Sequence, residues 1–239
     1  MNQTQTKIFH FCVPLWNRGN DISMLLENLN KIYSELDRTK ITFTVTISDF
    51  HSDDIDLEQK KKEIDFPLRI LYLDGRFNIA LSLQNSIDSI TKESINDNDI
   101  ILLCDADAVF DDGVNLLKEI SEQVIQGKTY YCPIVSTEAK PTWRCNFNGK
   151  IYVPVEDHWG CGTVATYVSD IKRTGGYHGS DFLGTRGEEW GGHDSLITSK
   201  LKGFLVPVRN IESRIWVRSH VRPTTNYWYR KAPTIYHGV

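Results

Sequence analysis

Strand-length apolar runs alternate with amphipathic helical patterns through the first half of the chain, and this alternation restricts the possible folds more than any other feature. The apolar runs cover residues 8–15, 41–48, 68–73 and 100–104. Apolar side chains recur at helical spacing in residues 21–36, 78–90 and 114–125. Such alternation is typical of βαβ units. The sequence therefore predicts an α/β fold with a mainly parallel central sheet flanked by helices.

The second half of the chain has shorter strand patterns and many glycines. Residues 130–135, 143–147 and 151–155 predict short strands, with Asn148-Gly149 as a hairpin turn. A helix is expected at residues 194–201, and further strands near Leu205 and Ile215. Nine glycines lie between Gly160 and Gly192, a density typical of a segment that approaches a ligand closely or closes over it, rather than of a packed element.

Size and charge exclude several classes of protein. A chain of 239 residues suits one large α/β domain, which we expect to span residues 1–239. No apolar run reaches the roughly 18 residues of a membrane-spanning helix. The net charge of −4 argues against nucleic acid as a partner. Residues 203–239 hold six basic residues against one acidic residue, so this basic tail could contact an anionic partner, including a membrane surface.

The N-terminal residues and the cysteines bear on the compartment. Residues 1–7 are polar, so no signal-peptide core is expected. The five cysteines contain no CxxC pair, and Cys12 and Cys104 lie inside apolar strand patterns. Reduced, buried thiols fit this pattern better than disulfides. We therefore expect a cytoplasmic protein.

Two aspartates follow the fourth strand pattern. Residues 100–104 (IILLC) are typical of a buried strand, and Asp105 and Asp107 come directly after it. Ligands of open parallel sheets bind beyond the carboxyl ends of the strands, so both carboxylates would face a site there. Their oxygen atoms suit Mg²⁺ or Mn²⁺, and such an ion can neutralise a departing diphosphate. The alternative is a solvated turn in which Asp107 or Asp111 caps the next helix.

A second candidate segment is Trp190-Gly191-Gly192-His193-Asp194. The two glycines let the backbone approach a ligand, Trp190 offers a face on which a sugar ring can stack, and Asp194 offers a carboxylate that can accept a hydroxyl proton. The alternative is that Asp194 only caps the helix that begins there, because carboxylates are favoured at helix N-termini.

A third candidate is His220, which follows the strand pattern near Ile215. A lone histidine is more often a surface or satisfied core residue than a ligand. The case for His220 as a metal ligand is stronger if carboxylates lie beside it, because Mn²⁺ takes mixed oxygen and nitrogen ligands more readily than Mg²⁺ does.

Together these segments resemble the inverting glycosyltransferases of the GT-A fold, which include the β-1,4-galactosyltransferases and the chondroitin N-acetylgalactosaminyltransferases. Residues 13–18 (VPLWNR) are similar to the opening strand and nucleotide loop of that family, and residues 76–80 (RFNIA) to its FNRA segment. Residues 104–110 match its strand with the acidic pair, and residues 131–135 resemble the strand that follows. Gly175-Gly176-Tyr177 precedes residues 190–194 (WGGHD), where the family has a glycine-containing turn and then WGGED.

The resemblance implies a function and a set of site residues. It implies a UDP-sugar donor, a bound Mn²⁺ or Mg²⁺ ion, and a glycan or polysaccharide acceptor whose hydroxyl proton passes to Asp194, the catalytic base. The implied metal ligands are Asp107 and His220, with Asp105 close by. The implied donor-binding residues are Pro14, Asn17, Arg18, Asp49, Arg76, Phe77, Asn78 and Asp105. The implied acceptor-binding residues are Trp190, Gly191, Gly192 and His193. Residues 1–110 would form the nucleotide-binding half and residues 111–239 the acceptor-binding half, which contains a smaller β region.

Two positions depart from the family pattern and keep alternatives open. His193 stands where the family usually has glutamate, and Ile79 where it has arginine. These departures bear on the acceptor and the donor, and they favour a second hypothesis, a nucleotide-sugar-binding module without turnover. A third is a sugar-phosphate nucleotidyltransferase, which the lack of a glycine-rich, lysine-containing loop near the N-terminus disfavours. A dinucleotide-binding dehydrogenase is disfavoured further, because no GxGxxG follows the first strand.

Overall fold

A computed structural model describes residues 6–92, 96–133, 135–137, 146–147, 150–151, 163–184, 193–209 and 215–217. Several predicted site residues lie outside these ranges, namely Trp190, Gly191, Gly192 and His220, as does the aromatic end of the basic tail. Within the described ranges, no helix combines the length and apolar character needed to cross a membrane.

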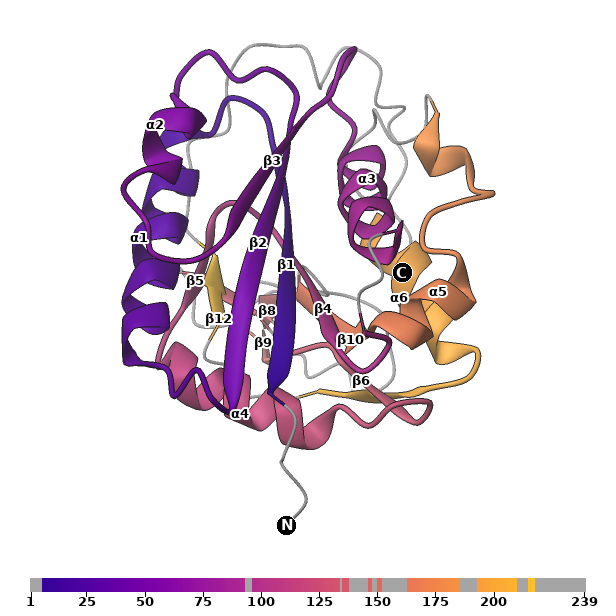
Figure 1. The fold of residues 1–239 in the computed structure, drawn as a ribbon. Coiled ribbons are helices and arrows are strands. Elements are labelled where there is room, and N and C mark those ends of the chain that lie inside the picture. Colours follow the sequence, from indigo (N-terminus) through magenta and orange to yellow (C-terminus); the bar gives the residue numbers. More distant parts are fainter. Residues whose placement is uncertain are drawn as a thin grey trace.

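A seven-stranded sheet forms the centre of the fold (Figure 1). Its strands follow the order β11-β6-β10-β4-β1-β2-β3. Their bounds are β1 Lys7–Leu15, β2 Ile41–Asp49, β3 Leu68–Tyr72, β4 Ile100–Cys104, β6 Thr129–Tyr131, β10 Thr163–Tyr167 and β11 Val206–Val208. Strands β1 to β4 are mutually parallel, whereas β10 runs antiparallel between β4 and β6. The predicted α/β fold with a mainly parallel sheet is confirmed.

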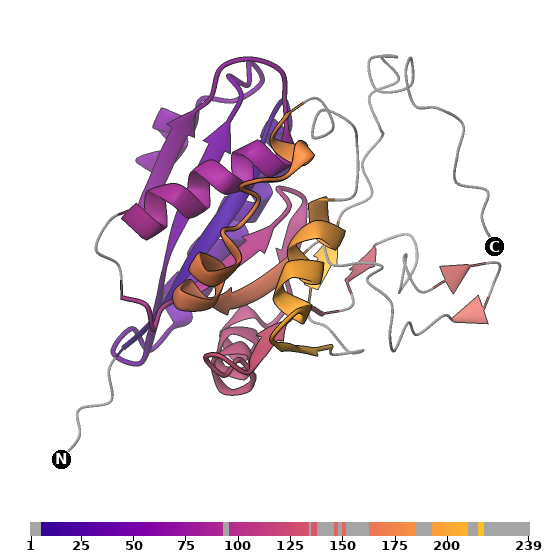
Figure 2. The ribbon, with the colours of Figure 1, turned by 90° about the vertical axis from the view of Figure 1, so that its right-hand side faces the viewer.

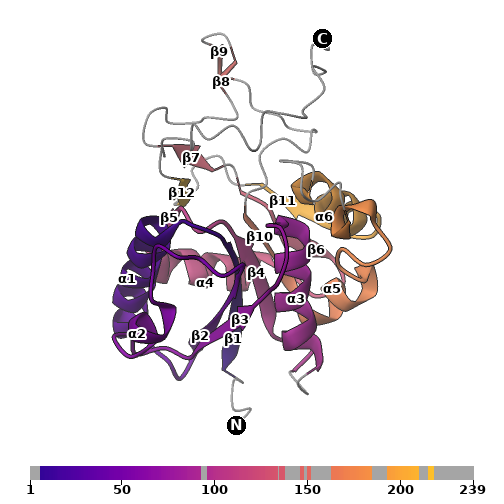
Figure 3. The same cartoon turned by 90° about the horizontal axis from the view of Figure 1, so that it is seen from above.

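Helices cover both faces of this sheet (Figure 3). One face carries α1 (Gly19–Glu35), α2 (Leu57–Lys61) and α4 (Gly113–Gln123). The other carries α3 (Ile79–Lys92), α5 (Val168–Thr174) and α6 (His193–Lys202), which Figure 2 shows from the side. Alternate residues of a strand point to opposite faces, so Phe11 joins one apolar cluster and Cys12 the other. A strand buried on both faces needs an uninterrupted apolar run, which is what its sequence shows.

A smaller β region stands beside the main sheet, as expected (Figure 3). Strands β5 (Ala108–Phe110), β12 (Ile215–Val217) and β7 (Ser136–Thr137) form one sheet, and β8 (Asn146–Phe147) pairs with β9 (Lys150–Ile151). Phe147 pairs antiparallel with Lys150, which confirms the predicted hairpin, although its turn residues lie outside the described ranges. The short elements α2 and β5 were not predicted.

The glycine-rich stretch is wrongly predicted over residues 163–174, where the chain forms β10 and α5 instead of a segment that approaches or covers a ligand. Every residue of β10 is buried, and Thr163 pairs with Cys104 of β4. The β-branched run at the start of β10 favours a strand, and a glycine count over the whole stretch hides it. The described glycines of this stretch begin at Gly175, which ends α5 with a φ of 69°.

The described thiols agree with the prediction of reduced cysteines. Cys12, Cys104 and Cys132 are buried and form no disulfide with another residue that the structure describes, while Cys145 and Cys161 lie outside the described ranges. Burial raises the pKa of the Cys104 thiol, and the nearby Asp105 charge raises it further. These thiols therefore act as small apolar groups in the core.

Candidate active site

Three parallel strands end at one edge of the sheet, and predicted site residues lie at or just beyond the end of each strand. Leu15 at the end of β1 pairs with Asp49 at the end of β2, and β4 ends at Cys104. Since ligands bind beyond the carboxyl ends of parallel strands, the loops after β1, β2 and β4 form the candidate site.

Hydrogen bonds tie the loop after β1 to the loop after β2. Asn17 N donates to Ser52 Oγ (2.9 Å), and Asp53 N donates to Asn17 Oδ1 (3.1 Å). Gly19 N donates to Asp54 Oδ2 (2.8 Å), and a Cβ on Gly19 would lie only 2.5 Å from the carbonyl oxygen of Asp54. The predicted nucleotide loop is therefore held firmly, and it needs glycine at position 19.

Asp49, the last residue of β2, holds the predicted nucleotide loop in place through Ser52. Its side chain is 1% exposed, and its carboxylate accepts hydrogen bonds from Ser52 Oγ (2.6 Å) and Ser52 N (3.1 and 3.2 Å). Ser52 in turn accepts the hydrogen bond of Asn17 N, so Asp49 positions a predicted donor-binding residue. Pro14 is buried within β1, where it pairs with Ser48.

Aromatic rings gather at the same edge. Trp16 stacks on Phe77 with ring centroids 5.8 Å apart, and the Phe50 ring stands at 85° to the Phe77 ring with centroids 5.6 Å apart. Arg76 is exposed beside them. Phe77 and Arg76 were predicted as donor-binding residues, whereas Trp16 and Phe50 were not. The sequence signal that could have identified Trp16 was its position inside the segment that resembles the nucleotide loop.

Asn78 joins α3 to the 3₁₀ helix η1 (Asp181–Leu183). Its Oδ1 accepts from Leu81 N (2.9 Å) at the start of α3, and its Nδ2 donates to the carbonyl oxygens of Phe182 (3.0 Å) and Gly184 (3.1 Å). The side chain is 3% exposed. In the described residues, Asn78 therefore holds two segments at the site edge together, and its predicted donor contact stays a prediction.

Arg18 and Asp107 form an ion pair across the site. Arg18 Nη1 lies 3.3 Å from Asp107 Oδ2 and 3.3 Å from Asp21 Oδ2. Asp107 is 8% exposed. The structure thus brings together a residue predicted to bind the donor and a residue predicted to bind the metal.

A small cavity of about 10 Å³ brings three further predicted residues together. Asp105 lines it from the end of β4, and His193 and Asp194 line it from the start of α6. Tyr177 lines the same cavity and was not predicted as a site residue. The tyrosine follows Gly175-Gly176, so its place after the expected glycine turn was the one signal in the sequence.

His193 and Asp194 also contact each other. His193 Nε2 lies 3.0 Å from Asp194 Oδ1, and the two side chains are 12% and 21% exposed. Asp194 lies in the first turn of α6, where the helix dipole favours a carboxylate. The first turn of α6 and the contact with His193 therefore both hold the carboxylate of the expected base in place.

The donor set at the end of β4 fits a divalent cation. Asp105 and Asp107 supply the carboxylate oxygens that Mn²⁺ and Mg²⁺ prefer. Among the residues that the structure describes, no group of three or more His, Cys, Asp or Glu side chains could hold a metal. The pairing of Val217 with Ala108 nevertheless brings β12 beside the residue that follows Asp107. His220, the expected third ligand, comes three residues after Val217 and lies outside the described ranges.

The order and direction of the strands, with helices on both faces, give the chain the fold of the GT-A nucleotide-sugar transferases. The helices on both faces and the additional β region belong to the same architecture. The chain belongs to the chondroitin N-acetylgalactosaminyltransferase family, whose model matches residues 1–222.

Solved structures share this fold at low sequence identity. The catalytic domain of Drosophila β1,4-galactosyltransferase 7 matches with a TM-score of 0.52 and 12% identity, over 87% of this chain and 67% of that one. TarS 1-349 from S. aureus matches with a TM-score of 0.59 and 13% identity, over 89% of this chain and 60% of that one. A 4-diphosphocytidyl-2C-methyl-D-erythritol synthase matches with a TM-score of 0.56 and 12% identity, over 93% of this chain and 96% of that one. No curated protein sequence matches this chain.

Proposed function

We propose that this protein is a metal-dependent inverting glycosyltransferase. It moves a hexose or N-acetylhexosamine, of the galactose or N-acetylgalactosamine type, from a UDP-sugar to a hydroxyl of a glycan or polysaccharide acceptor. The observation that carries this proposal is the cavity shared by Asp105, at the end of β4, and Asp194, at the start of α6. It joins the expected donor and metal side of the site to the expected base.

On the donor side, residues 1–110 supply the contacts. The Trp16 and Phe77 rings offer an apolar surface for the base, and Arg18 offers a cation for the diphosphate. Asp105, Asp107 and His220 would hold the cation, which when bound supplies positive charge that stabilises the leaving diphosphate.

On the acceptor side, Asp194 removes the proton of the attacking hydroxyl. The oxygen then forms a bond to the anomeric carbon from the face opposite UDP, the bond from that carbon to the diphosphate breaks, and the configuration inverts. His193 lies 3.0 Å from Asp194 and orients its carboxylate. Trp190, Gly191 and Gly192 complete the proposed acceptor side.

The comparisons support the substrate classes. The family description names an N-acetylgalactosaminyltransferase. A mutant of the Drosophila enzyme has been solved in complex with manganese, UDP-Gal and xylobiose, which are an ion, a donor and a saccharide of the proposed kinds.

Release of UDP tests the proposal. Wild-type protein is incubated with Mn²⁺ and either UDP-galactose or UDP-N-acetylgalactosamine, with and without mixed saccharide acceptors. We expect acceptor-dependent release of UDP. Asp37→Asn serves as a control, because Asp37 precedes β2 at the opposite edge of the sheet.

Two other outcomes would replace this proposal. UDP-sugar binding without turnover, measured by calorimetry, would favour the binding module. Release of pyrophosphate from UTP and a sugar phosphate would favour the nucleotidyltransferase, whose fold the chain shares with the diphosphocytidyl synthase.

We also propose a cytoplasmic setting, with peripheral membrane contact through the basic tail at residues 218–231. The reduced thiols of the described residues support this setting. Sedimentation of the full chain with anionic lipid vesicles tests the contact, with neutral vesicles as the control.

A further inference from the structure

Tyr177 is a buried tyrosine at the centre of the candidate site. Its side chain is 1% exposed, and it lines the cavity of about 10 Å³ together with Asp105 and Asp194. Its ring packs in the apolar cluster between the sheet and helices α3, α5 and α6. The phenol therefore brings a polar group to a cavity that both carboxylates also line.

The Tyr177 hydroxyl makes no hydrogen bond to any residue that the structure describes, although the backbone N and O of Tyr177 both do. Burial raises the pKa of Tyr177 well above its usual value, and the charges of Asp194 and Asp105 raise it further. A phenol with the ordinary tyrosine pKa of about 10 is protonated at neutral pH, so the hydroxyl can donate a hydrogen bond. Buried hydroxyls are almost always paired, with protein groups or with ordered water.

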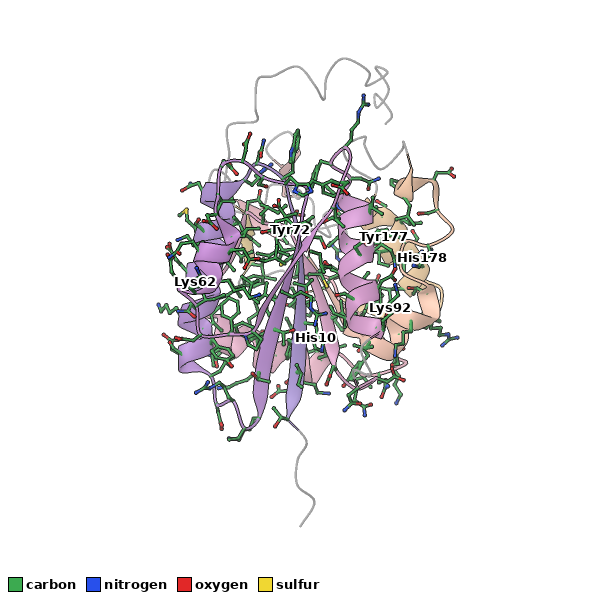
Figure 4. The ribbon with its side chains drawn as sticks, turned by 45° about the horizontal axis from the view of Figure 1, so that its top comes forward. His10, Lys62, Tyr72, Lys92, Tyr177 and His178 are labelled. Carbon is green, nitrogen blue, oxygen red and sulfur yellow. The ribbon has the colours of Figure 1, made fainter. Side chains whose placement is uncertain are left out.

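The loop that carries Tyr177 is held on two sides. Tyr177 N donates to Gln84 Oε1 of α3 (2.5 Å), and Figure 4 shows Tyr177 next to that helix. Lys200 of α6 donates from Nζ to the carbonyl oxygens of Gly176 (2.6 Å) and His178 (3.1 Å). Because α6 also carries Asp194, the same helix positions the carboxylate and the loop opposite it.

The volume of the cavity suits one water molecule. A cavity needs roughly 10–15 Å³ and two to four polar partners to hold an ordered water. Tyr177, Asp105 and Asp194 supply one donor and two acceptors at a cavity of about 10 Å³.

We propose that the cavity binds one ordered water molecule, which accepts a hydrogen bond from the Tyr177 hydroxyl and donates hydrogen bonds to the Asp105 and Asp194 carboxylates. Tyr177 is then a positioning residue that holds the base in a set relation to the donor side of the site. The effect on catalysis rests on the proposed function, whereas the water site does not.

Tyr177→Phe tests this proposal, because it removes the hydroxyl and keeps the ring. We expect kcat to fall about tenfold, the loss that one hydrogen bond of ordinary strength accounts for. The KM for the UDP-sugar and the affinity for UDP with Mn²⁺ should stay unchanged. Tyr130→Phe is the matched control, since Tyr130 is 2% exposed in the same apolar cluster but does not line the cavity.

Crystal structures of the unliganded wild type and of Tyr177→Phe supply the second measurement. We expect density for a water within hydrogen-bond distance of the Tyr177 hydroxyl and both carboxylates in the wild type, and its loss or displacement in the variant. A wild-type cavity without this water would overturn the proposal, as would an unchanged kcat in a folded Tyr177→Phe variant. If the wild type transfers no sugar, the proposed function fails, and the crystal structures alone decide whether the water site exists.

Discussion

Arg18 contacts Asp107 where β1 and β4 end, with 3.3 Å between Arg18 Nη1 and Asp107 Oδ2. A side-chain cation therefore neutralises the carboxylate that we expect to bind the metal. The same guanidinium lies 3.3 Å from Asp21 Oδ2, and its side chain is partly exposed, so it can also reach a diphosphate bound at the site. Binding of the cation and of the donor should consequently be coupled through Arg18.

Replacement of Arg18 tests this coupling. In Arg18→Ala, we expect Mn²⁺ alone to bind more tightly, because a competing positive charge is lost from Asp107. UDP with Mn²⁺ should bind about tenfold more weakly, because a charge-assisted contact to phosphate is lost. Isothermal calorimetry measures both affinities, and Arg38→Ala removes an equal charge from the surface beside Tyr33. Unchanged affinity for UDP would contradict the assignment of Arg18.

Replacement of Asp194 separates its two possible roles. Asp194→Asn keeps the size of the side chain and its suitability for a helix start, but it removes the proton acceptor. We expect kcat to fall by about a hundredfold or more, with the affinity for UDP nearly unchanged, because the base acts on the acceptor. Ser195→Ala, at the exposed neighbouring position, should retain full activity. A full rate in Asp194→Asn would show that Asp194 is only a helix cap.

Two glycines of the Tyr177 loop provide a matched test of its packing. Gly176 and Gly179 both have positive φ, of 58° and 74°. A Cβ on Gly176 would overlap Gln84 Oε1, whereas a Cβ on Gly179 would meet nothing within 4 Å. Both alanine variants should lose stability, by about 1 kcal/mol for the backbone strain at Gly179 and by more at Gly176. Urea unfolding measures the difference, and equal losses would mean that the Gln84 contact does not hold the loop.

The buried pair His10 and Asp99 makes stability depend on pH. His10 Nε2 lies 3.4 Å from Asp99 Oδ2, at the edge of the sheet opposite the site. Burial raises the pKa of Asp99 above 3.8, although the contact with His10 lowers it in part. For a raised carboxyl pKa, the contribution to stability is present below the unfolded value and is lost as pH rises through the folded value.

We therefore expect the unfolding free energy of the wild type, minus that of Asp99→Asn, to fall as pH rises through the range just above 3.8. For Asp37→Asn, we expect the same free-energy difference to rise as pH rises. A hydrogen bond from Lys40 is the main cause that lowers the pKa of Asp37 to about 2, so its contribution is present above 3.8 and is lost as pH falls toward 2. Urea unfolding at several pH values across this range measures both free-energy differences. If the two differences changed with pH in the same direction, these assignments would be contradicted.

Much of the fold and part of the site followed from local patterns. The apolar run of β4 had to be buried on both faces, and the rule that ligands bind at the carboxyl ends of parallel strands placed Asp105 and Asp107 at a site. The convergence of Asp105 with Asp194 and His193, from distant parts of the chain, agrees with that expectation. The positions of Trp190, Gly191, Gly192 and His220 stay predictions.

Other features depended on neighbours that are far apart in the sequence. The β10 strand pairs with β4 and β6, and the glycine count of the surrounding stretch hid its short β-branched pattern. Asp49 and Asn78 were predicted as donor contacts, yet the described contacts of their side chains hold loops together. Tyr177 gave no signal beyond its place after two glycines.

The sequence by itself determined which residues form strands and helices in the first half, because burial imposes a periodicity that each segment carries within it. It also predicted a chemical type for the site, since two carboxylates after a buried strand suit few ligands. Only the tertiary structure decided that Arg18 meets Asp107 and that Tyr177 lines the same cavity as Asp105 and Asp194. Such pairings depend on how loops from separate strands pack at one edge, where each position is set by contacts across the chain.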